Sequence, residues 1–589
     1  MTHKHDSLKR ESAQVRRLTS KGLVVGAAFL LGGALTTLAV PSGASTVSAK
    51  ADGASAVSRS TTSLAGVSYP TAIKPAAARN HQARVIPLLR PHGGTAQAKL
   101  APVVPSAPAP AGLKSAVKGR GVIHNFDGID AIQNKATAGF DLEPPDEGLG
   151  AGNGYVVNFV NVTGAVYRND GSTVAGPFYL NTFFNEPANT NTSDPRVFYD
   201  ASSHTWFGTI LEYQFTSGGT VSESHVDIAV SASANPAGMW RVYRLPTSDT
   251  NHAGCPCLAD YPIMGVDKHN VYISTNEFTA NLNGFNGTQV YAVSKSQLVA
   301  GRSSVNVVQF QNLSVAGTAA YHVQPANTYG AAAAEWMMSS LDPNGTNDHR
   351  LAVWAITNQR SVTTGHGTPT LSVRVVQSNT YSLPPNAQTP PGFCSGSACG
   401  SGGAPTTGVV QTDFDAMQEV QYIQGKLVGA LNTGVTVPGD PVERSGVLWV
   451  VVHPYVQGAS VSARTHVSRQ GYIAERGEYL LYPHINMTGN GSMAMVFGLG
   501  GPTTFLSTAY TTTAPGMGFQ QVYLAGAGTG PDNGFTGTQQ FGGAGRWGDY
   551  SNGQIIPGTR KVWLASQYIP NSGDGNANWG NRIFELKLS

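Results

Sequence analysis

The sequence carries little charge for its length: only 12% of its 589 residues are Asp, Glu, Lys or Arg. It also lacks any sustained helical period of apolar residues, and apart from Leu23–Val40 it has no apolar run that could cross a bilayer. These absences argue against a helical fold and against a membrane span in the mature chain.

Several catalytic motifs are missing as well. The chain has no Gly-x-Ser-x-Gly elbow, no His-Glu-x-x-His and no phosphate-binding loop. These motifs carry the chemistry of the common serine hydrolases, zinc peptidases and nucleotide-dependent enzymes. Their absence disfavours those three classes.

Only four cysteines are present: Cys255, Cys257, Cys394 and Cys399. An even number in an exported chain predicts disulfides, and three pairings are possible. A bridge between Cys255 and Cys257 would be strained, so we expect either a bridge between Cys394 and Cys399 or two bridges between the segments. A metal site at His252, Cys255 and Cys257 is disfavoured, because no second His/Cys pair has the standard spacing.

The first 120 residues have the composition of an export signal followed by a spacer. Residues 1–49 combine a basic, polar start with an apolar run and small residues where cleavage would occur, which predicts a signal peptide. Residues 50–120 are rich in Ala, Pro and Ser and cannot bury enough apolar surface to offset their ordering entropy. We therefore predict a disordered linker over 50–120 and a folded domain over 121–589.

Charge is distributed unevenly over these regions. The whole chain has a formal net charge of +3, residues 1–49 carry +4 and residues 50–120 carry +9, so residues 121–589 carry −10. An acidic domain argues against nucleic acid as the ligand and is compatible with cations or neutral polymers.

Glycine is abundant, with 70 residues, and so are Thr, Ser, Asn, Val and Tyr, which favours many short strands joined by tight turns. A turn followed by a β-run with small residues recurs seven times. These repeats begin at Pro144, Ser193, Ala259, Val323, Asp415, Tyr482 and Arg546. The steps between the starts are 49, 66, 64, 92, 67 and 64 residues, and the long step contains the Pro/Gly/Cys-rich insertion 382–408.

Repeats of this length, built from short strands, are typical of propeller blades. We therefore predict an all-β fold, a β-propeller with seven four-stranded blades; two β-sandwiches are the alternative. Small residues suit the innermost strands, where the backbones converge. The last β-run, 582–588, is expected to complete a blade shared with residues 122–126, because an open ring would expose sheet edges.

Several motifs carry a family resemblance. In chain order they are Phe126-Asp127-Gly128, Pro144-Pro145-Asp146, Ser193-Asp194-Pro195, Asp260-Tyr261-Pro262, Asn276-Glu277-Phe278 and Arg546-Trp547-Gly548-Asp549-Tyr550-Ser551. With these motifs the chain resembles a group of exported bacterial β-propeller proteins related in architecture to the sialidase-like propellers. The stretch from Ser231 to Trp240 is similar to a degenerate Asp-box, which is a structural turn. The resemblance implies the fold and an extracellular location but no activity, because a sialidase arginine triad with a Tyr/Glu nucleophile pair has no match in the chain.

Four aspartates occupy similar positions at the start of the expected innermost strands: Asp146, Asp194, Asp260 and Asp549. In a propeller these positions would meet at one mouth of the central channel. Grouped carboxylates there would coordinate Ca²⁺ or act as the acid and base of glycoside cleavage. The alternative is that each aspartate caps its own turn.

Two glutamates, Glu212 and Glu277, follow innermost-strand runs at comparable offsets and are candidates for a carboxylate pair across the channel. The alternative is that both face solvent. Arg196 and Arg546 lie beside motif aspartates, and they either clamp an anionic ligand or pair with those aspartates, which we favour.

Six polar aromatic residues are suited to stacking on sugar rings at the channel mouth: Tyr199, Tyr261, Tyr550, Trp547, His322 and His484. Packing between blades is the alternative use of such side chains.

The sequence therefore predicts a secreted or cell-surface monomer that recognises an extracellular polysaccharide or envelope polymer, with bound Ca²⁺. A glycoside hydrolase or lyase that uses the channel-mouth carboxylates is the second hypothesis, and a protein-interaction scaffold without catalysis is the third. The sequence does not decide whether the protein is an enzyme.

Overall fold

The computed structural model describes residues 46–48, 67–69, 83–86, 89, 121–341, 347–412 and 414–589. Contacts divide the chain into Met1–Gly43 and Ala44–Ser589, and all of the described residues belong to the second unit. Most of the predicted signal peptide and most of the predicted linker lie outside the described residues. No helix in the described part of the chain is long and apolar enough to span a membrane.

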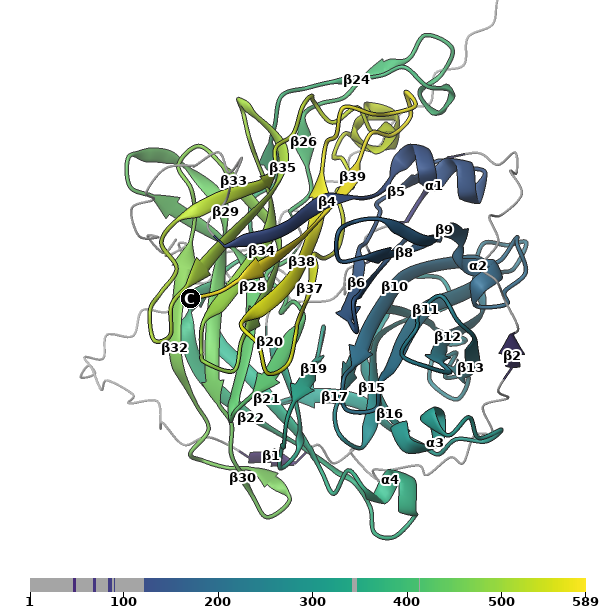
Figure 1. The fold of residues 1–589 in the computed structure, drawn as a ribbon, viewed down its shortest axis with the longest axis vertical. Helices are drawn as coiled ribbons and strands as arrows, with labels where there is room; N and C mark the ends of the chain where they lie inside the picture. Colours follow the sequence, from purple (N-terminus) through teal and green to yellow (C-terminus); the bar gives the residue numbers. More distant parts are fainter. Residues whose placement is uncertain are drawn as a thin grey trace, which may run out of the picture. The chain divides into compact units, whose positions relative to one another are not determined.

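Antiparallel meanders of four strands make up most of this structure, so the expectation of an all-β fold is confirmed (Figure 1). The first meander contains β6 (Gly148–Gly152), β7 (Tyr155–Val160), β8 (Thr163–Arg168) and β9 (Thr173–Tyr179). The second contains β10 (Asn191–Asp200), β11 (Thr205–Phe215), β12 (Val221–Ser231) and β13 (Trp240–Pro246), with β2 (Val67–Tyr69) added to its edge. The third contains β14 (Leu258–Val266), β15 (Asn270–Phe278), β16 (Phe285–Ser294) and β17 (Val307–Val315), followed by β18 (Thr318–Ala319).

The later meanders repeat this pattern. The fourth contains β19 (Gln324–Tyr329), β20 (Glu335–Ser340), β21 (Asp348–Thr357) and β22 (Thr370–Tyr381), with β1 (Thr46–Ser48) on its edge. The fifth contains β27 (Val420–Ile423), β28 (Lys426–Val437), β29 (Asp440–His453) and β32 (His466–Ile473). The next contains β33 (Tyr479–Met487), β34 (Met493–Gly501), β35 (Thr504–Thr513) and β36 (Val522–Gly526). Every predicted repeat start lies within, or shortly before, the first strand of a meander.

The last meander is completed by the beginning of the domain. It contains β37 (Asn552–Ile555), β38 (Lys561–Tyr568), β39 (Gly580–Lys587) and β4 (Val122–Asp130). Ile583 pairs with Phe126 and Glu585 with His124 in the antiparallel register of β39 and β4. This pairing confirms that the final β-run shares a sheet with residues 122–126, and it covers an edge of β39 that would otherwise be free.

The first strands of consecutive meanders lie next to one another in chain order, from β6 to β37, and β37 in turn contacts β6. β19 forms parallel backbone pairs with both β14 and β27. Small residues make this approach possible: a Cβ on Gly148 would lie 2.8 Å from the Pro195 oxygen, and one on Gly265 would lie 2.6 Å from the Pro325 Cβ. The small residues of the predicted innermost strands therefore have the packing role that the sequence indicates.

Apolar clusters fill the space between consecutive meanders. Phe159 of the first meander packs with Trp206 of the second, for example. Val156 of the first meander also packs with Trp563 and Ile583 of the last, so the first and last sheets share a core. Successive side chains of a strand point to opposite faces of the sheet. Because apolar residues occur at both sets of positions, each sheet can pack against two neighbouring sheets.

Short helices and short strands lie in the connections between the strands of the meanders. The helices are α1 (Ala131–Ala138), α2 (Leu180–Phe183), α3 (Lys295–Val299), α4 (Ser361–Thr364), and the 3-10 turns η1 (Ser397–Cys399), η2 (Phe535–Gly537) and η3 (Gln539–Phe541). The short strands are β3 (Arg84–Val85), β5 (Leu142–Glu143), β23 (Ala387–Gln388), β24 (Phe393–Cys394), β25 (Ala404–Pro405), β26 (Val409–Val410), β30 (Val456–Gln457) and β31 (Ser460–Val461). Helix α1 begins at a capping box, in which Asp130 accepts the Gln133 N–H and Gln133 accepts the Asp130 N–H.

Both cysteine pairs form disulfides within their own segments. Cys394 and Cys399 are bonded with a Cα–Cα distance of 6.1 Å, as one of the expected pairings has it. Cys255 and Cys257 are also bonded, at a Cα–Cα distance of 4.2 Å, so the expectation against this bridge is wrong. The physical reason is a tight turn, in which the Cys255 N–H donates to His252 and the Cys257 N–H donates to Ser248.

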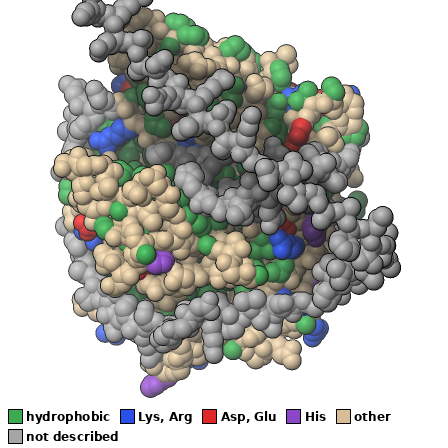
Figure 2. Space-filling model, turned by 180° about the vertical axis from the view of Figure 1, so that it is seen from behind, with side chains coloured by type: hydrophobic (Ala, Val, Ile, Leu, Met, Phe, Trp, Pro, Cys, Tyr) green, Lys and Arg blue, Asp and Glu red, His purple; other side chains and the backbone are tan. Residues whose placement is uncertain are grey.

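The surface reflects the low charge of the sequence. Figure 2 shows one face of the molecule, on which the described atoms are mostly backbone and uncharged polar side chains, with scattered charged residues. This face therefore offers no concentrated charge of one sign among its described residues.

Candidate functional site

The backbone is irregular where several innermost strands begin. Asp194, Tyr261 and Tyr482 each precede a proline and have positive φ values of 53°, 56° and 52°. The pairing register of β10, β14 and β33 shifts at these positions, as it does at a β-bulge. The right-handed helical region is disfavoured for a residue before proline, and the left-handed conformation costs about 1 kcal/mol or more for a residue other than glycine. The bulges therefore redirect these side chains out of the regular alternation of their strands.

Asparagines from neighbouring meanders hold this irregular backbone. Asn161 accepts the Asp194 N–H at 2.8 Å, and its amide donates to the Asp146 carboxylate at 2.6 Å. Asn432 accepts the Tyr482 N–H at 2.9 Å in the same way. Sequence reasoning missed these residues, although a recurrent asparagine in the second β-run of several repeats is a signal that could have found them.

Three of the four motif aspartates come together. Carboxylate oxygens of Asp146, Asp194 and Asp549 lie within 4.8 Å of one another, and all three side chains are buried. Asp146 precedes β6, Asp194 lies in β10 and Asp549 precedes β37, so three separate meanders contribute to this aspartate cluster. The reading in which each aspartate only caps its own turn does not account for this convergence.

The fourth motif aspartate, Asp260, lies at the edge of the aspartate cluster and is partly exposed. Burial raises its pKa to about 7, and the negative charge of Asp549 adds to the effect. This carboxyl group is therefore within electrostatic reach of the cluster while it remains open to a cavity.

The cluster holds more negative than positive charge. Burial raises the pKa values of Asp146 and Asp194 well above the ordinary range, neighbouring carboxylates including Asp549 raise them further, and Arg546 opposes the shift. One oxygen of Asp146 and one of Asp194 have no hydrogen-bond partner among the described residues. Buried carboxyl groups in this state take up either protons or a cation.

Arg546 pairs with Asp549, as the sequence indicates. Its guanidinium donates to the two Asp549 oxygens at 2.7 and 3.0 Å. It also donates to Gln411 at 3.2 Å and to the backbone oxygen of Ile86 at 3.1 Å. The bidentate geometry makes this a strong, directed ion pair, and it leaves Arg546 committed to protein partners.

Arg196 does not pair with the neighbouring aspartate, which is a correction to the favoured expectation. Its guanidinium carbon lies 3.3 Å from the centroid of the Tyr550 ring, and its Nη1 lies 3.9 Å from the Glu419 carboxylate. The register shift between Ser193 and Arg196 directs the arginine toward these residues. Its Nε and Nη1 have no hydrogen-bond partner among the described residues.

The predicted stacking residues are buried among themselves. Tyr261 stacks on His322 with ring centroids 4.1 Å apart, and its hydroxyl donates to the Asp549 backbone oxygen at 2.8 Å. Tyr550 meets Tyr261 edge to face, and His484 lies 3.2 Å from the Glu419 carboxylate. These rings pack against one another inside the protein, which agrees with the alternative hypothesis of internal packing and not with stacking on sugar rings.

The two candidate glutamates lie in different buried environments and face no solvent. Glu212 lies 2.7 Å from the His225 ring nitrogen, because the two residues are directly opposite in β11 and β12. Glu277 accepts from the Thr275 hydroxyl at 3.0 Å. Neither belongs to the aspartate cluster, and no described contact joins the two, so the structure does not form the predicted pair.

Glu212 belongs to a charged group that sequence reasoning missed. Glu186, Glu212 and His225 bring ligand atoms within 4.8 Å of one another, and Arg244 donates to Glu186. Burial alone would lower the pKa of His225, but its hydrogen bonds to Glu186 and Glu212 outweigh burial and raise it to about 9. The charges within this group compensate one another, which explains how they remain buried.

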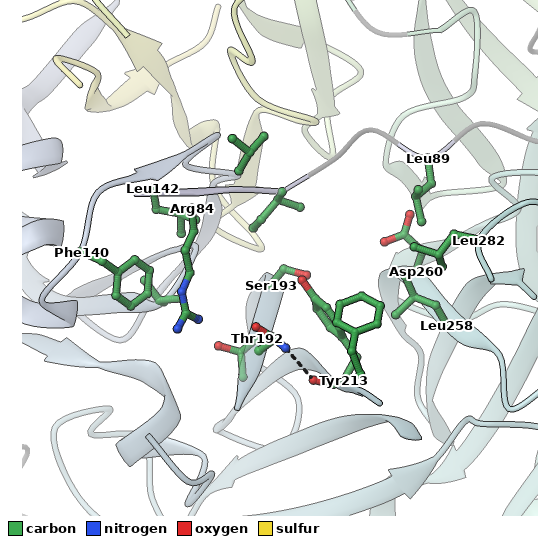
Figure 3. Close-up of a pocket in the computed structure, with 15 residues that line it drawn as sticks. Arg84, Leu89, Phe140, Leu142, Thr192, Ser193, Tyr213, Leu258, Asp260 and Leu282 are labelled. Carbon is green, nitrogen blue, oxygen red and sulfur yellow. Dashed lines mark hydrogen bonds between the residues drawn. The ribbon is translucent and has the colours of Figure 1, made fainter. Parts of the chain in front are cut away.

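A cavity of about 430 Å³ is lined by Asp260 and by Ser193, the residue that precedes Asp194 of the aspartate cluster (Figure 3). Arg84 lies over the Phe140 ring toward one end of the cavity, and Asp260 lies toward the other. Between them the walls combine hydroxyl and amide groups with aromatic and aliphatic side chains. The lining residues include Leu142, Val162, Asn191, Thr192, Ser193, Tyr213, Phe215, Leu258 and Leu282.

Comparison with known proteins leaves the family undetermined. No family model and no curated protein sequence matches the chain. A Hadza microbial sialidase is similar in structure, with 10% identity, a TM-score of 0.33 and coverage of 74% of this chain and 73% of that chain. An exo-β-1,3-galactanase from Clostridium thermocellum is 10% identical, with a TM-score of 0.28 and coverage of 80% of this chain and 96% of that chain. A Trypanosoma rangeli sialidase is 10% identical, with a TM-score of 0.29 and coverage of 75% of this chain and 60% of that chain. At these scores the similarity carries no argument about activity, and the family resemblance stays a prediction.

Proposed function

We propose that the described meanders are the blades of a seven-bladed β-propeller. Support comes from the order of contacts among the first strands, which returns from β37 to β6, and from the apolar core shared by the first and last sheets. The final sheet is completed by β4 from the start of the domain, a device that closes a ring without leaving a free edge on β39. In this arrangement the aspartate cluster lies at one mouth of the central channel.

We propose that this mouth binds an extracellular glycan. The observation that carries the proposal is the cavity itself, which places the Asp260 carboxylate beside hydroxyl groups and aromatic walls. Sugars present hydroxyl groups that hydrogen-bond to carboxylates and C–H faces that pack on aromatic rings such as Tyr213. The two disulfides are compatible with an oxidising, extracellular setting.

We further propose that the aspartate cluster holds Ca²⁺ next to the glycan. Ca²⁺ takes six to eight oxygen ligands, and carboxylates from Asp146, Asp194 and Asp549 would supply part of such a set. The unpartnered oxygens of Asp146 and Asp194 support this assignment, because a cation would satisfy them without protonation. Two free hydroxyl groups of a sugar ring and water would complete the coordination sphere.

A glycoside hydrolase is the second candidate, and one observation favours it. Asp260 combines access to the cavity with a pKa of about 7, which suits a general acid. Glycoside cleavage requires a second carboxyl group in the same cavity, and Asp260 is the only acidic residue among the described lining residues. Binding is therefore the function that the geometry supports best.

The test is binding of the full-length protein to a panel of soluble polysaccharides, measured by calorimetry with the Asp260→Asn variant alongside. We expect at least one polysaccharide to bind, and we expect the variant to lose about tenfold or more in affinity because a charge-assisted hydrogen bond is removed. Asp170→Asn is the matched control, since Asp170 is an exposed carboxylate in a turn. Failure of every polysaccharide to bind would favour an interaction scaffold, whereas release of reducing ends would favour the hydrolase.

A further inference from the structure

A short piece of the N-terminal region lies against the proposed binding site. We call the described residues 83–86 and 89 the N-terminal strap. Its strand β3 pairs in parallel with β5, the Arg84 N–H donates to the Asp141 oxygen at 2.8 Å, and the Ile86 N–H donates to the Glu143 oxygen at 3.0 Å. In these positions the predicted linker has backbone partners in the domain.

The two ends of the strap are held by different parts of the domain. Ile86 packs with Phe140 and Leu142 ahead of the first meander. Leu89 packs with apolar residues that include Leu258 of β14, and its oxygen accepts the Tyr321 hydroxyl at 3.2 Å. Ile86 therefore contacts the chain before the first meander and Leu89 contacts the start of the third, and Figure 3 shows Leu89 beside Asp260.

The guanidinium of Arg546 contacts both the strap and the aspartate cluster. Arg546 donates to both oxygens of Asp549 and also to the backbone oxygen of Ile86. The strap also forms part of the cavity wall, through Arg84, Ile86 and Leu89. A ligand that reaches from the cavity to the carboxylates must therefore share or take the space that the strap occupies.

Charge favours docking of the N-terminal region on the domain. Residues 50–120 carry a net charge of +9, and residues 121–589 carry −10. Opposite charges of this size attract a tethered segment, and a tether keeps it at an effective concentration of roughly millimolar. The hydrogen bonds of the described strap residues involve their backbone groups, so a ligand with stronger contacts can displace the strap.

We propose that the N-terminal strap is an intramolecular ligand of the binding site, which competes with the extracellular ligand and controls access to the carboxylates. The inference rests on the proposed function for the identity of that ligand. In the docked state Ile86 and Leu89 form part of the cavity wall that also contains Asp260, and Ile86 accepts a hydrogen bond from Arg546, the partner of Asp549. When the strap is displaced, the carboxylates open to solvent and the site binds its ligand with its full intrinsic affinity.

The test uses the full chain with the strap weakened at both ends by Ile86→Asp and Leu89→Asp together. Carboxyl groups are labelled with a carbodiimide and an amine, and the labelled residues are located by peptide mapping. We expect labelling of Asp260 and Asp549 to rise roughly tenfold, in line with release of a tethered competitor. Ile123→Asp is the control, because Ile123 is 41% exposed and lies away from the strap in β4.

A milder variant keeps the proposal testable if the double variant does not fold. Tyr321→Phe removes only the hydroxyl that donates to Leu89, and it should raise the labelling of Asp260 by a smaller factor. Unchanged labelling in a folded strap variant, with amide exchange that shows release of residues 84–86, would overturn the proposal.

Binding measurements separate this proposal from the proposed function. If a polysaccharide binds, the strap variants should bind it more tightly than the unaltered chain and Ile123→Asp. If labelling rises but no polysaccharide binds to any variant, the glycan proposal fails and the strap proposal stands. If polysaccharide binds equally to all variants and labelling does not change, the strap proposal fails alone.

Discussion

Arg546 connects the parts of the site at the scale of single residues. Its guanidinium binds the Asp549 carboxylate in two places and also holds Gln411 and the oxygen of Ile86. Burial would lower the pKa of Arg546, but the neighbouring carboxylates, Asp549 above all, more than compensate and raise it. A buried guanidinium remains charged only while such partners are present.

Asp549→Asn should therefore destabilise the protein. The change removes the bidentate partner of a buried arginine, and losing one partner of a buried ion pair costs roughly 3 kcal/mol. Urea denaturation should show the midpoint of unfolding at a lower concentration. Asp348→Asn is the matched control, because Asp348 forms a similar bidentate pair with Arg350, whose side chain is 49% exposed, and the loss of stability should be smaller. Equal losses of unfolding free energy in the two variants would contradict the inference that the burial of Arg546 makes its ion pair more important for stability.

His225 gives the protein a predicted pH dependence. Its pKa is raised from 6.5 to about 9 in the folded state, so its contribution to stability is complete below pH 6.5 and is lost as the pH rises through 9. The loss is at most about 3 kcal/mol in free energy of unfolding. Urea denaturation at pH 6 and pH 9 measures it.

Replacement of His225 tests the cause of that slope. His225→Gln should remove most of the loss between pH 6 and pH 9, whereas the exposed His349→Gln should retain it. A slope that survives in His225→Gln would assign the pH dependence to other groups.

Contacts in the site that form within one turn of the chain were predictable from the sequence, whereas contacts that depend on a β-bulge were not. Arg546 and Asp549 are three residues apart in one turn, so their pairing follows from local geometry. Arg196 is only two residues from Asp194, but a bulge between them sends its side chain to Tyr550 and Glu419. A bulge depends on contacts with a neighbouring strand, which no local pattern of residues contains.

At the scale of elements, the innermost strands begin with strained backbone that neighbouring sheets hold in place. Tyr482 in β33 has a φ of 52°, and its N–H is accepted by Asn432 of β28. The Asn432 amide also donates to the Leu480 oxygen at 2.7 Å. These bonds cross from one meander to the next, so they fix the relative position of two sheets as well as the local conformation.

Asn432→Ala should weaken this junction. Asn432 is fully buried, and its loss leaves the buried Tyr482 N–H without its acceptor, which costs about 1–3 kcal/mol. Thermal unfolding followed by circular dichroism should show a lower midpoint. Asn283→Ala, at an exposed loop position, should change the midpoint little. A midpoint that is equal in the two variants would mean that the cross-sheet bond adds nothing.

Element positions were more predictable than their connections. Every predicted repeat start, from Pro144 to Arg546, falls at the first strand of a meander, because turn residues and small residues recur with the strands they serve. The N-terminal strap was not predictable, since composition averages over the region 50–120 and a few docked residues do not alter the average. The Cys255–Cys257 bridge was considered and wrongly disfavoured for a related reason, because it depends on one tight turn.

At the scale of the whole molecule, the site draws on sheets that are far apart in the chain. The aspartate cluster takes one carboxylate from the start of the first meander, one from the second and one from the last. One apolar core joins the first and last of these sheets, and another joins the first and second. A cation bound by the cluster would therefore stabilise the junction between the first and last sheets as well as the proposed glycan site.

The proposal that the aspartate cluster binds Ca²⁺ is tested most directly by thermal unfolding of the metal-stripped protein with and without Ca²⁺. The Asp194→Asn variant is measured in the same way for comparison. Asparagine tolerates the left-handed conformation of Asp194, so the variant removes the charge with little change in the backbone. Asp170→Asn is the control. Ca²⁺ at 100 times its Kd should add about 2.7 kcal/mol to the unaltered chain and the control, and almost nothing to Asp194→Asn. Identical melting of the unaltered chain with and without Ca²⁺ would contradict the claim.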